Sequence, residues 1–333
     1  MMMNRINEQY ENGSFYSIAE IDQFSRDVTS SHEPGFMINR KENGAVILHT
    51  LYLGQFYPKI KYYLSQFDRQ HVYAEYVQLF RDACSSVGLN PSTLNDDPYT
   101  FYPTSRRFGA EIYNALLEKM RSMSYTLEFR KRVYDREYNA VRNYQSCEAY
   151  VDALFDERCG YSRLLVLRLD FGYRKSECAT IEQAQDDIER YLNNRRSNSL
   201  FDTRVGYIIA LECTVDKGPH MHCFFFLDGS KSYEHVYLAQ EYGRYWSKIT
   251  AERGIFFNCN MKAGEYRNCG IGMIHYADTQ MRENLLIPIR YITKSDQSVL
   301  VKASPKTRTF WRGQMPNERI SRAGRPRTMA VCF

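Results

Sequence analysis

The sequence predicts an α+β protein with a mainly helical N-terminal region and an antiparallel sheet in its C-terminal half. Two observations predict this division. Residues 1–155 carry charged, helix-like runs, the longest from about residue 110 to 155, after a turn-rich stretch at 88–105. From Arg163 onward, short apolar runs alternate with helical segments. We therefore expect a helical region at 1–155, a sheet domain at 156–301 and a basic tail at 302–333.

The elements of the second half follow a regular order. The expected elements are a strand at 163–171 ended by Gly172, a helix at 180–196 capped by Thr180, strands at 204–215 and 219–227, a helix at about 232–253, shorter strands at FFNCNM and IGMIHY, and a helix that carries RYITKSDQ. The order β-α-β-β-α-β is the split βαβ pattern of ferredoxin-like sheets.

Composition limits the class of protein. Of the 333 residues, 44% are hydrophobic and 25% are charged, which is typical of a globular chain with a substantial core. The sequence has no apolar run of the roughly 18 residues that a membrane span needs, and its N-terminus has no apolar segment typical of a signal peptide. We expect a cytoplasmic protein without a membrane partner. The nine cysteines contain no CxxC pair, so reduced thiols are expected.

Positive charge is concentrated at the C-terminus. From Lys302 onward, eight basic residues stand against one acid, and the rest of the chain has a net charge of −2. This local excess predicts contacts with phosphates, although a solvated terminus would show the same composition. The residues expected to contact DNA are Arg290, Lys302, Lys306, Arg308, Arg312, Arg325 and Arg327.

The sharpest motif is His220-Met221-His222 within a predicted strand. Side chains of a strand alternate between its two faces, so both imidazoles emerge on one side. Two imidazoles on one face form the beginning of a metal site. A structural role for a histidine pair is the alternative.

Glu212 on the preceding strand is the expected third ligand. If the loop is Asp216-Lys217-Gly218, Val215 faces Pro219, and Glu212 falls opposite His222 and diagonal to His220. Cross-strand neighbours have Cβ atoms roughly 5 Å apart, close enough to share an ion. A bulge would change this register.

One carboxylate and two imidazoles favour an exchangeable divalent cation. Nitrogen and oxygen ligands with open positions suit Mn²⁺ or Mg²⁺, and imidazole favours Mn²⁺. Zinc would require a cysteine beside the histidines, but alternation places Cys223 on the opposite face from both of them.

The second motif is Tyr291-Ile292-Thr293-Lys294. Pro288 fits the first turn of a helix, on which Tyr291 and Lys294 would be neighbours on one face. A phenol is a weak nucleophile at neutral pH and needs a nearby cation and a polarised electrophile. Lys294 and the metal would supply both. By itself the pattern also fits an ordinary amphipathic helix.

In this order, the three segments LLVLRLDF, PHMHCFFF and YITK resemble the motifs of the HUH endonucleases. More narrowly, ECTVDKGPHMHCFFFLDG followed by RYITKSDQ resembles the replication proteins of inovirus-type filamentous phages and prophages. The resemblance covers about residues 160–315.

The resemblance implies a function. Glu212, His220 and His222 would bind the metal, Tyr291 would attack the phosphodiester, and Lys294 would assist by its charge. The products are a 5′-phosphotyrosine and a free 3′-OH, and this nicking would initiate rolling-circle replication in a bacterial host cell. The sequence has no GxxxxGK[ST] loop, so a host helicase and polymerase are the expected partners, together with single-stranded or origin DNA.

Other functions fit the same motifs. A transposase or a relaxase would use the same site, and a non-catalytic DNA-binding regulator could keep the fold. A zinc-stabilised interaction protein is the fourth possibility, which tightly held zinc would distinguish.

Overall fold

The computed structural model describes residues 14–67, 73–92, 94–158, 160–194, 198–214, 217–294 and 308–317. The chain divides into two compact units, Met1–Arg136 with Gln297–Pro305, and Glu137–Asp296 with Lys306–Phe333. The division therefore falls inside one long helix, α6 (Leu127–Phe155), earlier than the boundary expected at residue 155. The physical reason is that Cys147, Tyr150 and Leu154 near its end are buried in the core of the second unit.

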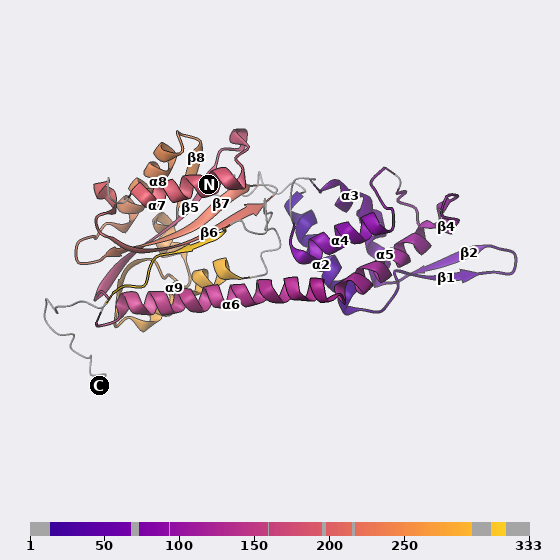
Figure 1. The fold of residues 1–333 in the computed structure, drawn as a ribbon, viewed down its shortest axis with the longest axis horizontal. Coiled ribbons are helices and arrows are strands. Elements are labelled where there is room, and N and C mark those ends of the chain that lie inside the picture. The colour runs from indigo at the N-terminus through magenta and orange to yellow at the C-terminus, as the bar shows by residue number, and fades with distance from the viewer. Residues whose placement is uncertain are drawn as a thin grey trace. The chain divides into compact units, whose positions relative to one another are not determined.

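The first unit contains helices and two small hairpins. Its elements are α2 (Ser14–Ser30), β1 (Phe36–Arg40), β2 (Val46–Thr50), η1 (Tyr52–Lys59), α3 (Ile60–Ser65), α4 (Glu75–Ser86), β3 (Phe101–Tyr102), β4 (Arg107–Phe108), α5 (Gly109–Ser124) and the first part of α6 (Figure 1). Arg121 of α5 is buried and donates hydrogen bonds to the carbonyl oxygens of Val28, Ser31 and Glu33. These bonds fix the end of α2 against α5.

The second unit is built on a six-stranded antiparallel sheet. Its elements are β5 (Arg163–Tyr173), η2 (Lys175–Glu177), α7 (Ile181–Asn193), η4 (Ser199–Phe201), β6 (Arg204–Thr214), β7 (Gly218–Asp228), α8 (His235–Ile249), β8 (Gly254–Asn258), η5 (Cys259–Glu265), β9 (Gly272–His275), α9 (Thr279–Thr293) and β10 (Phe310–Arg312). The strand order is β10-β6-β7-β5-β8, and β9 also pairs with β5. The protein is thus a mixed α+β chain with an antiparallel sheet.

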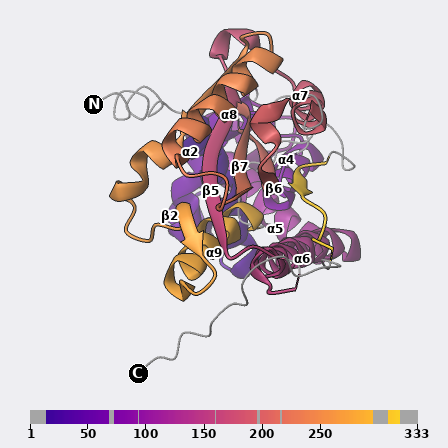
Figure 2. The same cartoon turned by 90° about the vertical axis from the view of Figure 1, so that its left-hand side faces the viewer.

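Helices cover both faces of this sheet. Helices α7 and α8 lie on one face, and α9 and the end of α6 lie on the other (Figures 1 and 2). The alternation expected for β7 is confirmed: the Phe225 ring lies 5.8 Å from Tyr191 of α7 and 5.0 Å from Tyr242 of α8, whereas Phe224 and Phe226 belong to the core beneath α6 and α9. The even-numbered residues of β7 therefore share one face.

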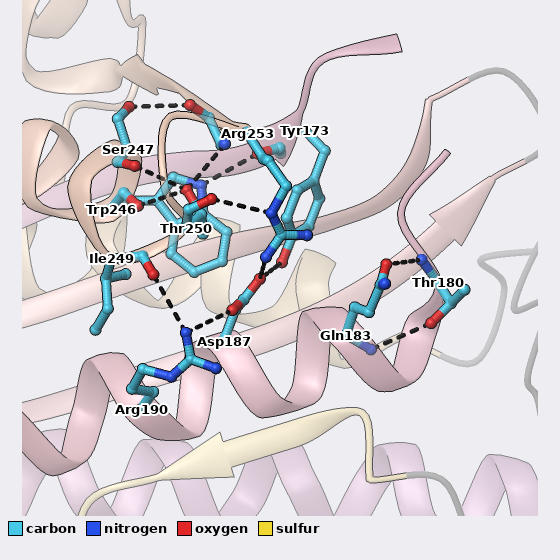
Figure 3. Close-up of polar contacts among 12 residues, drawn as sticks. Tyr173, Thr180, Gln183, Asp187, Arg190, Trp246, Ser247, Ile249, Thr250 and Arg253 are labelled. Atoms are coloured by element: carbon cyan, nitrogen blue, oxygen red, sulfur yellow. Dashed lines mark hydrogen bonds and ion pairs between the residues drawn. The ribbon is translucent and has the colours of Figure 1, made fainter. Parts of the chain in front are cut away.

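Polar contacts hold α7 and α8 to the sheet. Thr180 caps α7, as expected, by accepting from the Gln183 N–H at 3.2 Å. The buried carboxylate of Asp187 on α7 accepts from Tyr173 of β5 at 2.9 Å and from Arg253 at 3.1 Å (Figure 3). Because a buried carboxylate must be paired, this contact fixes α7 between β5 and the loop that follows α8.

Two expected boundaries in this unit are wrong. β5 continues through Gly172 to Tyr173, because Gly172 pairs with Ile255 of β8. Phe310–Arg312, expected in a separate basic tail, forms β10 and pairs with Ile208–Ala210 of β6. The buried Trp311 explains this, since its apolar ring belongs to the core and not to a solvated tail.

Among the described residues, no helix is long and apolar enough to cross a membrane.

Candidate metal centre

The hairpin of β6 and β7 brings the three expected ligands together. Glu212 pairs with His220, and Ala210 pairs with His222, so Glu212 is diagonal to His222. The expected pairing of Glu212 with His222 is therefore wrong. The shift is two residues, which preserves the face on which each side chain lies. For this reason Glu212 still meets both histidines.

The cause of the shift lies at the turn. Thr214 pairs with Gly218, and Cys213, not Val215, pairs with Pro219. Gly218 is the first residue of β7, because it pairs with Thr214, and its φ of +62° is a conformation that glycine adopts without strain. Val215 and Asp216, which we placed at the turn, lie outside the described residues.

The ligand atoms of the three side chains converge. Glu212 Oε2 lies 3.5 Å from His220 Nε2, and Glu212 Oε1 lies 3.5 Å from His222 Nε2. One ligand atom from each residue lies within 4.8 Å of the others, and no other such group of three occurs among the described residues. The three side chains are between 12% and 16% exposed, so the site is largely shielded from solvent.

Both imidazoles are oriented by their second nitrogen. His220 Nδ1 lies 3.0 Å from the Gly218 carbonyl oxygen, and His222 Nδ1 lies 2.7 Å from Asp170 Oδ1. An acceptor at Nδ1 fixes the ring and directs Nε2 toward the ligand position, as in metal sites supported by a second layer of residues. Asp170 lies directly opposite His222 on β5.

The ionisable groups of the centre change one another's pKa values. Burial by itself would raise the pKa of Glu212, but the two imidazoles outweigh burial and hold that pKa at about 2. Burial likewise opposes the charged form of His222, but Asp170 and Glu212 raise its pKa to about 10. The pKa of Asp170 is below its usual range, because His222 offsets the effect of burial. Without a cation, the two carboxylates therefore favour the protonated form of His222.

The donor set fits a divalent cation. Glu212 Oε1 is buried and makes no hydrogen bond among the described residues, because His222 Nε2 faces it at 3.5 Å without hydrogen-bond geometry. A cation between Glu212 and the imidazoles would satisfy this oxygen. The cysteines next to the ligands in sequence, Cys213 and Cys223, are buried and are not in the cluster. Two imidazole nitrogens and carboxylate oxygen suit Mn²⁺, or Mg²⁺ where it is more abundant.

The helix that carries Tyr291 differs from the expectation. α9 starts at Thr279, where Asp278 accepts from the Met281 N–H at 3.0 Å, and continues through Pro288 to Thr293. Pro288 therefore lies inside the helix and not in its first turn. Lys294 is the C-cap of the helix: its ψ of 144° turns the chain out of the helix after this residue, while its N–H still donates to the Tyr291 carbonyl oxygen. The preceding apolar residues explain the longer helix, because Leu285 and Ile289 are buried together.

Tyr291 lies beside a pocket of about 320 Å³ that Arg168 of β5 also lines. The tyrosine is 56% exposed. Arg168 and Asp170 are two residues apart on β5 and therefore share a face of the sheet. Because Asp170 contacts His222, this arrangement connects the tyrosine pocket to the metal centre through one strand.

Tyr276 is the last tyrosine before α9, and it lies at the far end of β5. It follows β9, whose His275 pairs with Arg163. Arg163 and Asp170 are seven positions apart, a distance of roughly 23 Å along a strand. This position places Tyr291, and not Tyr276, next to the metal-supporting part of β5.

The expected DNA-contacting residues fall into three groups. Arg290 lies on α9 beside Tyr291, and its guanidinium stacks 4.6 Å from the Tyr144 ring. Arg308 precedes β10 and lies over the ring of Trp311. Arg312 is the last residue of β10 and lies over the ring of Tyr150. The remaining four, Lys302, Lys306, Arg325 and Arg327, lie outside the described residues.

Two residues of the site did not emerge from the sequence. Asp170 and Arg168 interrupt the apolar strand LLVLRLDF, and a charge within a buried strand is a recognisable signal. Their role depends on the pairing of β5 with β7, which residues far apart in the sequence make.

Comparison of the chain with protein-family models, with curated proteins and with solved structures finds no match.

Proposed function

We propose that this protein is a metal-dependent endonuclease of the HUH class that nicks and rejoins single-stranded DNA through Tyr291. One observation carries the proposal. Glu212, His220 and His222 converge on one position, and their supporting strand β5 also lines the pocket that contains Tyr291. A metal centre and an accessible phenol on one face of one sheet are the parts that this chemistry needs.

The architecture supports the same proposal. In chain order the elements β5-α7-β6-β7-α8-β8 give the strand order β6-β7-β5-β8, with every pair antiparallel. This is the order expected of a split βαβ, ferredoxin-like sheet, and we propose that the sheet is of the HUH endonuclease type. The two histidines lie on the central strand β7 and the third ligand lies on its neighbour.

Glu212, His220 and His222 would hold Mn²⁺ or Mg²⁺, and Asp170 would keep His222 in position. The bound cation would polarise the scissile phosphodiester as a Lewis acid. Among the described residues three side chains would hold the cation, and phosphate oxygens of the substrate suit such an ion as further ligands.

The chain itself supplies the nucleophile. The Tyr291 oxygen would form a bond to phosphorus while the bond to the 3′-oxygen breaks, and that oxygen would leave with a proton as a 3′-OH. The product is a 5′-phosphotyrosine, and the reverse reaction rejoins the strand. Lys294, whose N–H donates to the Tyr291 carbonyl at 3.2 Å, would stabilise the developing negative charge.

In the cell, this reaction would initiate rolling-circle replication of a phage or prophage element. The motifs HMH and YITK in this order support that role, with origin DNA, a host helicase and a host polymerase as partners in the bacterial cytoplasm. A transposase or relaxase would use the same chemistry on other DNA.

A covalent adduct tests the proposal. The purified full chain is incubated with a panel of single-stranded oligonucleotides from the element that encodes it, with Mn²⁺, Mg²⁺ or EDTA. We expect a protein–DNA adduct that survives denaturing electrophoresis, with either metal but not with EDTA. Undiminished cleavage in EDTA would contradict a metal mechanism, and DNA binding without any adduct would instead indicate a regulator.

A further inference from the structure

The pocket beside Tyr291 has a lining that suits one nucleotide. Three elements contribute to it: β5, the loop between η5 and β9, and α9. Its lining residues are Arg168, Tyr266, Arg267, Asn268, Gly270, Ile271, Ile287, Pro288 and Tyr291. Two of these are cationic, two are tyrosines and none is acidic. Its volume of about 320 Å³ lies at the lower end of the range for ligand pockets of about 300–1,000 Å³.

Arg168 is an unusual residue to find in the sheet. Its guanidinium lies 5.6 Å from the centre of the Phe224 ring, over the core-facing side of β7. Its Nε atom is buried and has no hydrogen-bond partner among the described residues. A buried donor without an acceptor is destabilising, and a phosphate oxygen in the pocket is the kind of acceptor that would satisfy it.

The backbone of Arg168 is held in place independently of its side chain. Its N–H donates to Asn260 Oδ1 at 2.7 Å, and the Asn260 amide donates to the Val166 carbonyl at 2.9 Å. These bonds fix η5 on β5, so the loop carrying Tyr266 and Arg267 starts from a rigid position. A site with such support is preorganised for a ligand.

Arg267 completes the positive charge of the pocket. It is exposed, and within the described ranges it makes no ion pair with a carboxylate. Tyr266, which is half-buried, and Tyr291 add aromatic surface on which a base can stack. Two guanidinium groups with aromatic rings favour a nucleotide over an acidic peptide, which offers carboxylates but no base.

We propose that this pocket binds one nucleotide of single-stranded DNA, with its phosphate between Arg168 and Arg267 and next to Tyr291. The proposal rests on the proposed function for the identity of the strand. It adds a binding site that is separate from the metal ligands, and it assigns Arg168 and Arg267 the task of positioning the strand for attack.

The test measures binding without catalysis. A fluorescein-labelled oligo(dT) of ten nucleotides is titrated with the full-length protein in EDTA, and the anisotropy is followed at several salt concentrations. The variants are Arg168→Lys, which keeps the charge but loses the fork of donors, and Arg267→Ala. The matched control is Arg244→Ala, an exposed arginine of α8 on the other face of the sheet.

We expect each pocket variant to bind about tenfold more weakly, equivalent to about 1.4 kcal/mol, with the control unchanged. For Arg267→Ala the slope of log K against log salt should also fall by about 0.7, the value for one phosphate contact on a single strand. If Arg168→Lys does not fold, as circular dichroism would show, the exposed Arg267 carries the test by itself.

Three results would overturn the proposal that this pocket binds a nucleotide. They are parental affinity and salt slope in Arg267→Ala, failure of the parent to bind oligo(dT), and displacement of oligo(dT) by poly-glutamate as effectively as by unlabelled DNA of equal charge. The proposed function fails separately, if the parent forms no adduct with any origin strand. Weaker binding of the pocket variants together with no adduct would leave a single-strand binding site without the nicking reaction.

Discussion

Glu212 occupies a position that an apolar strand rarely allows to a carboxylate. It lies between two imidazole Nε2 atoms at 3.5 Å each, and their influence keeps the carboxylate ionised despite burial. A metal cation would take over part of this compensation, because it is a larger charge than one imidazolium. The buried charge of Glu212 is therefore compensated by the imidazoles when no cation is bound, and by the cation and the imidazoles together when one is.

The Tyr291→Phe variant should form no adduct and should not nick, while its affinity for single-stranded DNA stays within about twofold of the parent. The substitution removes one oxygen and keeps the ring that lines the pocket. Denaturing electrophoresis of labelled DNA measures the adduct, and anisotropy measures binding. The matched control is Tyr276→Phe at the far end of β5, which should nick normally. An adduct in Tyr291→Phe that disappears in the double variant would assign the nucleophile to Tyr276.

The Asp170→Asn variant should bind Mn²⁺ about 10- to 100-fold more weakly, the usual effect of removing a carboxylate that orients a histidine ligand. The cause is the loss of the 2.7 Å contact that fixes His222. Isothermal titration calorimetry measures the affinity, and excess Mn²⁺ should restore nicking. Asp186→Asn, on the exposed side of α7, serves as the control. Unchanged affinity in Asp170→Asn would mean that His222 needs no support from β5.

The sequence predicted the ligands of the centre better than their pairing. The face on which Glu212, His220 and His222 lie follows from alternation within strands, which is a local property. The register of the hairpin does not follow from alternation, since it depends on whether Gly218 closes the loop or begins the strand. Asp170 could not be predicted as a partner of His222, because strand pairing over 52 residues leaves no local pattern.

At the scale of elements, α9 shows why its start was misplaced. A proline fits the first turn of a helix, and this preference predicts a start at Pro288. The buried positions Leu285, Ile289 and Ile292 continue one apolar face across the proline. Burial of that face outweighs the hydrogen bond lost at Pro288, so packing and not local preference sets the limits of α9.

Two truncations should separate the last strand from the residues after it. A chain ending at Asn317 keeps β10 and should unfold at the same urea concentration as the parent, because the truncation spares Trp311. A chain ending at Val301 loses the buried Trp311 and the contact between the Leu211 N–H and the Thr309 carbonyl. Its free energy of unfolding should fall by about 3 kcal/mol or more.

The chain ending at Asn317 also tests the contribution of the tail to DNA affinity. It removes four arginines and one acid after Asn317, so the dependence of DNA binding on salt should become weaker while adduct formation persists. An unchanged salt dependence would show that these arginines do not contact phosphates. Equal stability of both truncated chains would contradict the place of β10 in the sheet.

For the whole molecule, metal affinity should rise with pH. The pKa of His222 is raised to about 10, so at neutral pH a cation must displace its proton before the imidazole can bind. Between pH 6.5 and 9 we expect the affinity for Mn²⁺ to increase about tenfold per pH unit, as for the release of one proton. Calorimetry in buffers of different ionisation enthalpy counts the protons released. An affinity independent of pH would show that His222 is already neutral.

Without added metal, stability should change in the opposite direction over this range. The raised pKa of His222 contributes stability fully below its unfolded value of 6.5, and this contribution is lost as the pH rises toward 10. The lowered pKa of Glu212 contributes stability above 4.5, and this is lost as the pH falls toward 2. Urea unfolding in EDTA should therefore show greatest stability, from this site, between about pH 4.5 and 6.5.

The place of β10 also has a consequence for synthesis of the chain on the ribosome. β6 is translated about 100 residues before the strand that covers its edge. At 5–20 residues per second, this edge stays open for roughly 5–20 s, together with the space that Trp311 fills. An uncovered strand edge is a template for pairing between nascent chains. Neighbouring ribosomes on one message would expose such edges at the same time, so slow translation of the last segment should favour aggregation over release of folded protein.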